Sequence, residues 1–220
     1  MDKTLKRLIW FTIPAPAIFL AIIWNRLPAI VPVHYNLHGE ADRYGNKNEL
    51  LLLCGLLIGV SLVMYLLVSN IYRVDPKRNA PENKLRLHRV AFSISVFLSV
   101  LNCIIIYSSY HQDIKWTMRL MLAAIGLLFT VLGNYMHTIK PNYFIGIRLP
   151  WTLENEENWR KTHMLAGKLF FSGGLLIILI SFLIPIPWIF PVFTTFTVLA
   201  CLIPCIYSFQ LYKNQKLNRD

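Results

Sequence analysis

Six long apolar runs dominate the sequence and restrict the folds that are open to it. Each run has about the 20 residues that an α-helix needs to cross the ~30 Å hydrocarbon core of a bilayer. Runs so long and so frequent are not typical of buried helices in a soluble domain, and a helix satisfies its own backbone polar groups in lipid. The sequence therefore predicts an all-α fold, a polytopic membrane helical bundle with six transmembrane helices. The predicted spans are residues 8–24, 50–72, 90–110, 118–136, 169–186 and 188–212.

The distribution of positive charge predicts the orientation of this bundle. The net charge is +11, yet only 15% of the residues are charged, against about a quarter in soluble proteins. If the spans alternate in direction, 17 of the 22 Lys and Arg residues fall on one side. Basic residues gather on the cytoplasmic side of membrane proteins and are attracted there by anionic lipid. We therefore expect cytoplasmic N- and C-termini, and no nucleic-acid partner.

The first apolar run has a second interpretation. The segment "MDKTLKR" before it resembles the start of a signal peptide, and "APA" at residues 15–17 resembles a cleavage site. That site would leave only a short apolar stretch before it, so we expect a retained helix.

The central parts of the six spans lack Asp, Glu, Lys, Arg and His. A proton-coupled pump or an intramembrane hydrolase needs such groups, which are costly to keep in lipid and mark function there. Cys201 and Cys205 share a helix face, but no His or carboxylate lies in the same span to complete a metal site. We expect no enzyme activity, no cofactor and no metal. Specific function should then lie in two elaborate loops. Close helix packing is expected at Gly55, Gly59 and residues 172–174.

The outer loop, residues 25–49, is longer than a simple connection requires. Pro28 and Pro32 predict an extended first part. Turns should follow, with Gly39 and Gly45 free to take positive φ. The loop is interpreted as a solvated packing element or a peptide-facing lid, and spacing alone does not establish a divalent metal site. The side chains that could form such a site are His34, His38, Glu40 and Asp42.

The inner loop, residues 137–168, divides into an open part and a helix start. Pro141, Pro150 and a special-φ Gly146 hold the first part open. Thr152 is the expected N-cap of a helix that lies along the membrane and then turns into the fifth span. Acidic residues followed by basic ones match the helix dipole and form i, i+4 pairs. The expected pairs are Glu156–Arg160 and Glu157–Lys161, and the residues expected to share one helix face are Trp159, His163, Ala166 and Phe170.

Two stretches resemble a known family of bacterial membrane proteins. The motif "GNYM" at residues 133–136 is followed by "NYFIGIRLPWTLENEENWRKT". This chain resembles the SdpI family. Typical of that family are an Asn-containing helix end, a Gly-hydrophobic-Arg-x-Pro-Trp-Thr-Leu run, an acidic stretch and a Trp. Leu149 departs from this pattern, because the family usually has Thr at that position. The outer "LPAIVPVHYNLHGEADRYGNK" resembles the N-terminal domain of uncharacterised function that often accompanies the family.

The resemblance implies a non-catalytic, multi-pass protein of the bacterial cytoplasmic membrane that confers immunity to a secreted, membrane-active toxic peptide and has a linked signalling role. Implied partners are the lipid bilayer, the toxic peptide outside and a cytosolic regulator inside. The motif positions carried over are Asn134, Asn142, Gly146, Arg148, Pro150, Trp151, Thr152, Leu153 and Trp159. Outer candidates for partner contact are His34, Gly39, Asp42 and Tyr44. The alternative is a shared packing motif, in which Arg148 caps carbonyls or phosphate and Trp151 is an anchor.

We expect three parts in the chain. Residues 1–72 form a two-helix unit with outer loop 25–49, residues 73–89 a basic cytoplasmic loop, and residues 90–220 a four-helix SdpI-like unit. Peptide binding outside would be coupled to the inner loop and the basic segment. The alternative function is a small transporter or a lipid-interacting envelope protein, and an enzyme would have to use loop His and carboxylate groups.

Overall fold

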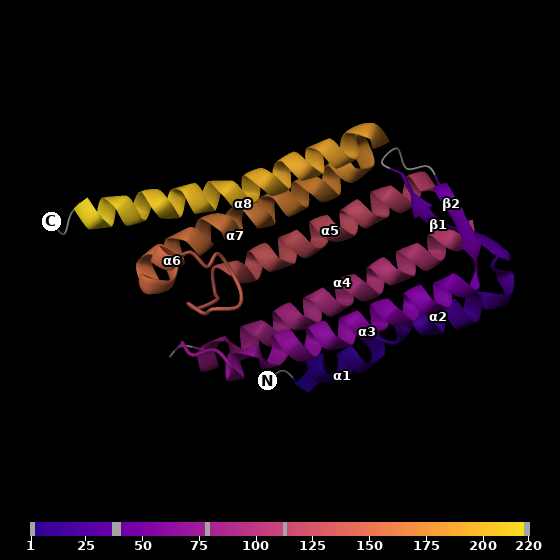
Figure 1. Cartoon of the computed structure of the whole chain (residues 1–220), viewed down its shortest axis with the longest axis horizontal. Helices are drawn as coiled ribbons and strands as arrows, with labels where there is room; N and C mark the ends of the chain where they lie inside the picture. The colour runs from indigo at the N-terminus through magenta and orange to yellow at the C-terminus, as the bar shows by residue number, and fades with distance from the viewer. Residues whose placement is uncertain (1–2, 37–40, 78–79, 112–113, 218–220) are drawn as a thin grey trace.

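The computed structural model describes residues 3–36, 41–77, 80–111 and 114–217, and these form a bundle of long helices with one small sheet (Figure 1). The first half contains two short helices, a β-hairpin and two long helices. The second half contains a long helix, a short one and two more long helices. In chain order the elements are α1 (Lys3–Thr12), α2 (Ala15–Ile23), η1 (Trp24–Arg26), β1 (Ile30–Tyr35), β2 (Ala41–Asn46), α3 (Asn48–Asn70), η2 (Ile71–Arg73), η3 (Ala80–Asn83), α4 (Lys84–His111), α5 (Ile114–Met136), α6 (Pro150–Glu154), α7 (Glu156–Leu183) and α8 (Ile186–Leu217).

Six helical segments in the described parts of the chain are long and apolar enough to cross a membrane. Five are α3, α4, α5, α7 and α8, and the sixth is the α1–α2–η1 segment, residues 4–26. Their outer surfaces carry exposed large apolar side chains, such as Leu52 at 76% and Leu183 at 70% exposure. Such surfaces are stable against lipid, in which they need no protein cover. The prediction of a six-span membrane bundle is confirmed.

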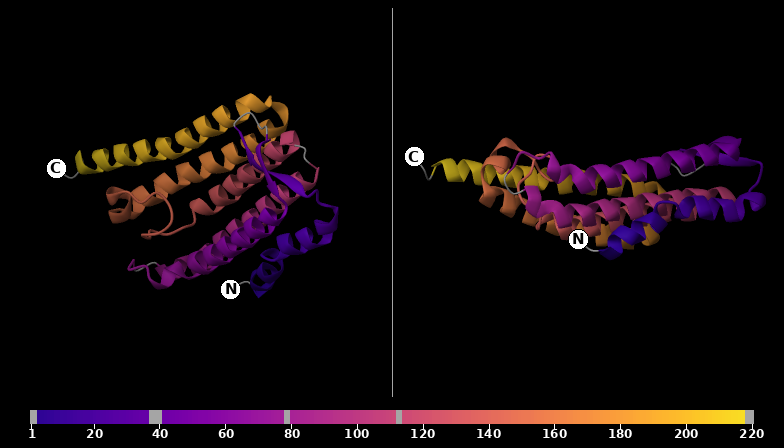
Figure 2. Two further views of the ribbon diagram at one scale, coloured as in Figure 1. Left: turned by 45° about the vertical axis from the view of Figure 1, so that its right-hand side comes forward. Right: turned by 90° about the horizontal axis from the view of Figure 1, so that it is seen from below.

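The long helices lie side by side in the order α3, α4, α5, α7, α8 (Figure 1). Additional views show an elongated bundle that is flattened in one direction (Figure 2). The hairpin lies at one end of the bundle. The short helix α6, the start of α1 and the end of α8 lie toward the other end, which we call the motif end.

Polar side chains and close backbone contacts join the helices, as is usual where lipid supplies no hydrophobic driving force between them. Asn102 on α4 donates a hydrogen bond to the Cys54 carbonyl of α3, at 3.2 Å. Helices α5 and α7 approach so closely that a Cβ on Gly174 would lie 2.5 Å from the Gly126 carbonyl oxygen. Close packing at Gly174 is therefore confirmed. The prediction of close packing is wrong for Gly55 and Gly59, because a Cβ added to either residue would meet nothing within 4 Å.

The first span is broken near its middle. Helix α1 ends at Thr12 and α2 begins at Ala15. Pro14 and Pro16 have no backbone N–H, so the carbonyls of Trp10 and Thr12 lose the donors that a continuous helix would supply four residues later. The break follows directly from the sequence "TIPAP".

The outer loop forms a β-hairpin, which corrects the prediction of an irregular, turn-rich segment. Strand β1 is extended, as Pro28 and Pro32 suggested, but it also pairs antiparallel with β2, from Ile30 opposite Asn46 to Tyr35 opposite Ala41. A register irregularity follows Pro32, which has no N–H to donate to the ladder. Gly45 lies within β2, and among the described glycines only Gly146 has positive φ, so Gly45 does not use the conformational freedom that glycine offers.

Two expectations for the start of the fifth span are also wrong. Helix α7 is continuous over 28 residues and does not first lie along the membrane. At about 1.5 Å per residue such a helix exceeds the hydrocarbon core, so its charged first turns can extend into the headgroup region without a bend. Its N-cap is Asn155, whose side-chain oxygen accepts from the Asn158 N–H at 2.9 Å. Thr152 belongs to the separate short helix α6.

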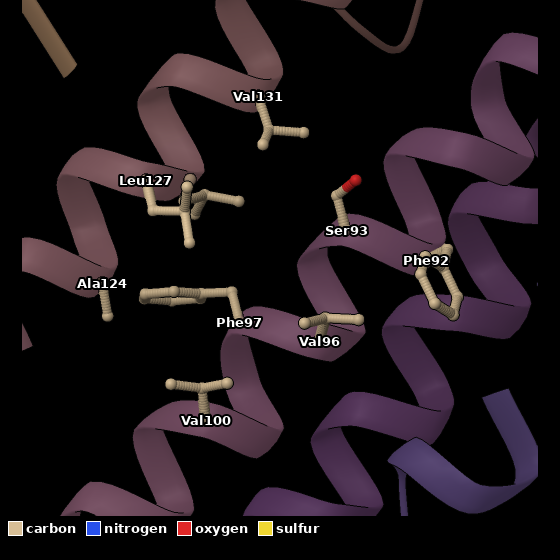
Figure 3. A pocket seen from close by; sticks show the side chains of 9 residues that line it. Phe92, Ser93, Val96, Phe97, Val100, Ala124, Leu127 and Val131 are labelled. Carbon is tan, nitrogen blue, oxygen red and sulfur yellow. The ribbon is translucent and has the colours of Figure 1, made fainter. Parts of the chain in front are cut away.

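Between α4 and α5 the packing leaves an apolar groove of about 180 Å³ (Figure 3). Side chains of both helices point into it, among them Phe97, Val100 and Leu127. Ser93 is its polar lining residue, and its hydroxyl donates to the Arg89 carbonyl at 2.9 Å. The groove lies where the N-terminal half of the bundle, which ends with α4, meets the C-terminal half, which begins with α5.

Candidate functional site

Asn142 organises the motif loop, residues 137–149, between α5 and α6. Its side chain is buried, with 3% exposed. The amide oxygen accepts from the N–H groups of Phe144 and Ile145 at 2.9 and 2.7 Å. The amide nitrogen donates to the carbonyls of Lys140 and Ile145, both at 3.0 Å. One side chain thus fixes a turn that no regular secondary structure stabilises.

Trp159 and His163 on α7 attach this loop to the bundle. The indole N–H of Trp159 donates to the Ile139 carbonyl at 2.8 Å. The imidazole Nε2 of His163 lies 3.0 Å from the Ile147 N–H, and its Nδ1 lies 2.9 Å from the Trp159 carbonyl. A carbonyl can only accept and an amide N–H can only donate, so this geometry requires the neutral Nδ1–H tautomer. The two rings stack with centroids 3.9 Å apart.

Gly146 lies directly against this imidazole. Its φ is +103°, a region that favours glycine, which confirms the predicted special-φ position. A Cβ on Gly146 would overlap the His163 imidazole and approach the Trp159 ring to 3.3 Å. Only glycine allows the loop backbone to pass this close to the two rings.

Arg148 and Thr152 close the second half of the loop. The Arg148 guanidinium donates to the Tyr143 carbonyl at 2.8 Å, so this side chain caps a carbonyl, as one interpretation expected. Thr152 is fully buried, and its hydroxyl lies 2.8 Å from the Ile147 carbonyl and accepts from the Leu149 N–H at 2.9 Å. Pro150 is the first residue of α6, where its missing N–H costs nothing.

Trp151 connects α6 to the last helix. Its indole N–H donates to the Ser208 hydroxyl at 3.0 Å, and its ring stacks on Tyr212 with centroids 5.7 Å apart. Asn158, fully buried on α7, donates to the Ser208 carbonyl at 2.9 Å. Trp151 is therefore an anchor on α8 rather than a free side chain.

The basic segment of residues 73–89 contacts the same loop from the N-terminal half. Asn83 and Lys140 exchange two hydrogen bonds of 3.1 and 2.9 Å. Asp75 accepts from the Tyr143 N–H at 3.1 Å, and Lys77 donates to the Leu153 carbonyl at 2.8 Å. The two halves of the bundle are thus hydrogen-bonded to each other at the motif end.

The structure separates the predicted residues into two sets. Asn142, Gly146, Arg148, Pro150, Trp151, Thr152, Leu153 and Trp159 lie together at the motif end. Asn134 lies on α5 with an exposed side chain, apart from the hydrogen bonds of the motif loop.

The outer set lies on the hairpin at the opposite end (Figure 1). The Nδ1 atom of His34 on β1 lies 2.6 Å from a carboxylate oxygen of Asp42 on β2, and Tyr44 is 59% exposed. Gly39, His38 and Glu40 fall outside the described residues. In the described parts no three His, Cys, Asp or Glu side chains are grouped closely enough to hold a metal ion.

Several residues that complete the motif end were not among the predicted site residues. They are polar groups buried on membrane helices or placed on the preceding basic segment, namely His163, Asn158, Asn83, Asp75 and Lys77. The four-residue spacing of Trp159 and His163 signalled a shared face. Nothing in the sequence signalled the contacts of Asn83 and Asp75, which are more than 55 residues away from their partners in the chain.

Comparison with known proteins yields matches at both ends of the chain. Residues 138–208 match the SdpI/YfhL protein family, and residues 11–58 match a domain of unknown function, DUF1648. The immunity protein SdpI of Bacillus subtilis (strain 168) is 25% identical over 199 residues, which cover 90% of this chain and 89% of that protein. No solved structure matches the chain. Residues 138–149 of the motif loop, α6 and α7 fall within the first match, and the hairpin falls within the second.

Proposed function

The match over residues 138–208 and the similarity along most of the chain assign it to the SdpI family, and from this premise we propose that it protects its cell against a secreted, membrane-active toxic peptide. The observation that carries the proposal is the extent of the similarity. It covers 90% of this chain and 89% of a protein named for immunity. The protein would act in the cytoplasmic membrane and without catalysis.

The peptide would be engaged at the outer end of the bundle. The hairpin offers exposed apolar and aromatic side chains there, Ile30 at 63% and Tyr44 at 59% exposure. The buried Val31 seats the hairpin in a cluster that includes Ile106 of α4. A peptide that partitions into the bilayer would meet this surface at the level of the headgroups.

Peptide binding at the outer end would be coupled to the inner side of the membrane through α4. This single helix of 28 residues runs from the hairpin cluster to the motif end. There, Asn83, just before its first residue, is hydrogen-bonded to the motif loop. A cytosolic regulator would recognise the exposed surface of that loop. Such coupling requires two states that both sites bias.

The direct test is a challenge experiment. The gene is deleted, and the strain is exposed to spent medium from its own and related cultures, with survival counted against the parent. Deletion should sensitise the strain, and the wild-type gene should restore survival. Equal survival of both strains in every medium would refute protection.

A transporter is the second candidate, and the broken first span favours it. Ser99 on α4 is buried, with 6% exposed, and its hydroxyl has no hydrogen-bond partner in the described structure. It lines a groove of about 450 Å³ together with Thr12 and Ala15 at the break. Discontinuous helices that face a cavity are typical of substrate sites in transporters. Proteoliposomes that take up none of a panel of labelled cations and amino acids faster than empty vesicles would exclude this function for that panel.

A further inference from the structure

A basic pocket lies at the motif end, between α1, the end of α3 with η2, and the start of α4. Its volume is about 420 Å³. Lys6, Arg73, Lys84 and His88 contribute to its lining, and no carboxylate does. These side chains come from segments up to 82 positions apart, so the fold rather than a local run of charge assembles them.

Among the described residues, no carboxylate forms an ion pair with the cations of this pocket. The ion pairs Lys161–Glu157 and His34–Asp42 lie elsewhere in the structure. Like charges held close together repel one another, and the repulsion is relieved when an anion binds between them. Basic side chains gathered without a counter-charge therefore point to an anionic ligand.

Tyr72 holds two of these cations beside each other. The Lys84 ammonium lies 5.5 Å from the centroid of its ring and the Arg73 guanidinium 5.9 Å. The Arg73 Nε–H also donates to the Tyr72 hydroxyl, at 3.4 Å. Cation–π contacts position the charges without cancelling them, so both remain available to an anion. The centroid of the His88 ring lies 6.4 Å from the centroid of the Tyr72 ring.

The rest of the lining is mixed: Ser69 and Asn70 are polar, and another part is apolar. Trp10 and Leu66 line it, and both are largely exposed, at 66% and 50%. They belong to two predicted spans, so their exposed surfaces lie against lipid tails. A ligand that fills the pocket thus needs an anionic group beside the cations and apolar chains beside Trp10 and Leu66. A phospholipid has both, whereas inorganic phosphate has only the first.

We propose that this pocket binds the headgroup phosphate of an anionic phospholipid, with the acyl chains lying along Trp10 and Leu66. The site anchors α1 to the α3–α4 pair at the motif end. Anionic lipid attracts basic segments at membrane surfaces in general, but here the ligand occupies one defined place. The proposal does not depend on the immunity role, and the two can fail separately.

The test counts the lipid that the purified full-length chain retains. The protein is exchanged into neutral detergent, supplied with dioleoyl phosphatidylglycerol or dioleoyl phosphatidylcholine, and weighed by native mass spectrometry. The wild type should retain one phosphatidylglycerol in preference to phosphatidylcholine. Arg73→Gln with Lys84→Gln should weaken this retention on the order of tenfold or more. Lys213→Gln with Lys216→Gln removes the same charge from exposed positions on α8 and should leave retention nearly unchanged.

Three results would overturn the proposal. Equal losses in the two double variants would mean attraction by net charge alone. Equal retention of the two lipids would mean that the anionic headgroup is not recognised. Displacement of the lipid by inorganic phosphate at concentrations comparable to the lipid would mean a phosphate site. Lys6→Gln removes a cation on the other side of the pocket. It is an independent variant for the same measurement of retained lipid. Circular dichroism and elution volume verify that each variant is folded.

Discussion

At the scale of single residues, the motif end depends on a few side chains that each satisfy several backbone groups. His163 on α7 uses both ring nitrogens, one of them toward the motif loop, and Asn142 makes four hydrogen bonds within that loop, which lacks regular structure. A buried polar network of this kind specifies one conformation, because loss of any member leaves buried partners unsatisfied. This explains why so many polar residues are concentrated in one connection of an apolar chain.

Gly146→Ala should destabilise the protein by at least about 1 kcal/mol, because alanine disfavours positive φ and its Cβ would displace the His163 imidazole. Gly55→Ala is the matched control. Its Cβ meets nothing within 4 Å on a regular helix, so it should be neutral or slightly stabilising. Thermal unfolding of the two purified variants in the same detergent measures the difference. Equal midpoints would contradict the contact between Gly146 and His163.

The residues of the motif loop could be named from the sequence, but their partners could not. The pattern from Asn142 to Trp159 was visible, and so was the need for positive φ at Gly146. The hydrogen bonds of Trp151 to Ser208 and of Lys77 to Leu153 join residues 57 and 76 positions apart. Local pattern carries no information about such pairs, because they depend on how the spans are arranged.

At the scale of elements, hydropathy identified all six spans because each is long, apolar and uncharged at its centre. The hairpin was missed for a physical reason. Its strands are short, one contains Pro32 and the other is mostly polar, so neither has the apolar alternation of a half-buried strand. Val31 and Pro32 are both buried, and two adjacent buried residues leave no alternating signal.

The contact between α5 and α7 should be the packing interface most sensitive to added volume. Gly174→Val would push its side chain into the Gly126 carbonyl and Thr130, at a cost of about 1–3 kcal/mol or more. Gly59→Val on α3 adds the same atoms toward open space. The folded fraction recovered after extraction and size-exclusion chromatography should fall for the first variant alone. A similar yield from both would mean that α5 and α7 do not pack through these glycines.

At the scale of the whole molecule, the charge asymmetry predicts that the hairpin is outside and the motif end is inside. Alkaline phosphatase, which is active only outside the cytoplasm, should be active when fused after Lys47 and silent when fused after Glu157. A fusion after Lys213 should also be silent, because six spans return the chain to its starting side. Activity after Glu157 together with silence after Lys47 would reverse the orientation and move the proposed peptide-binding surface to the motif end.

The central claim is that the folded motif end takes part in protection. Its most direct test is survival of the deletion strain under challenge when it carries wild type, Arg148→Ala, Trp151→Ala or Trp188→Ala. Trp188 is 63% exposed near the other end of α8, so its variant controls for loss of an aromatic side chain. Immunoblots of the membrane fraction establish equal amounts of each protein. We predict that wild type and Trp188→Ala restore survival, whereas Arg148→Ala and Trp151→Ala do not. Full protection by both motif variants at equal abundance would contradict the claim.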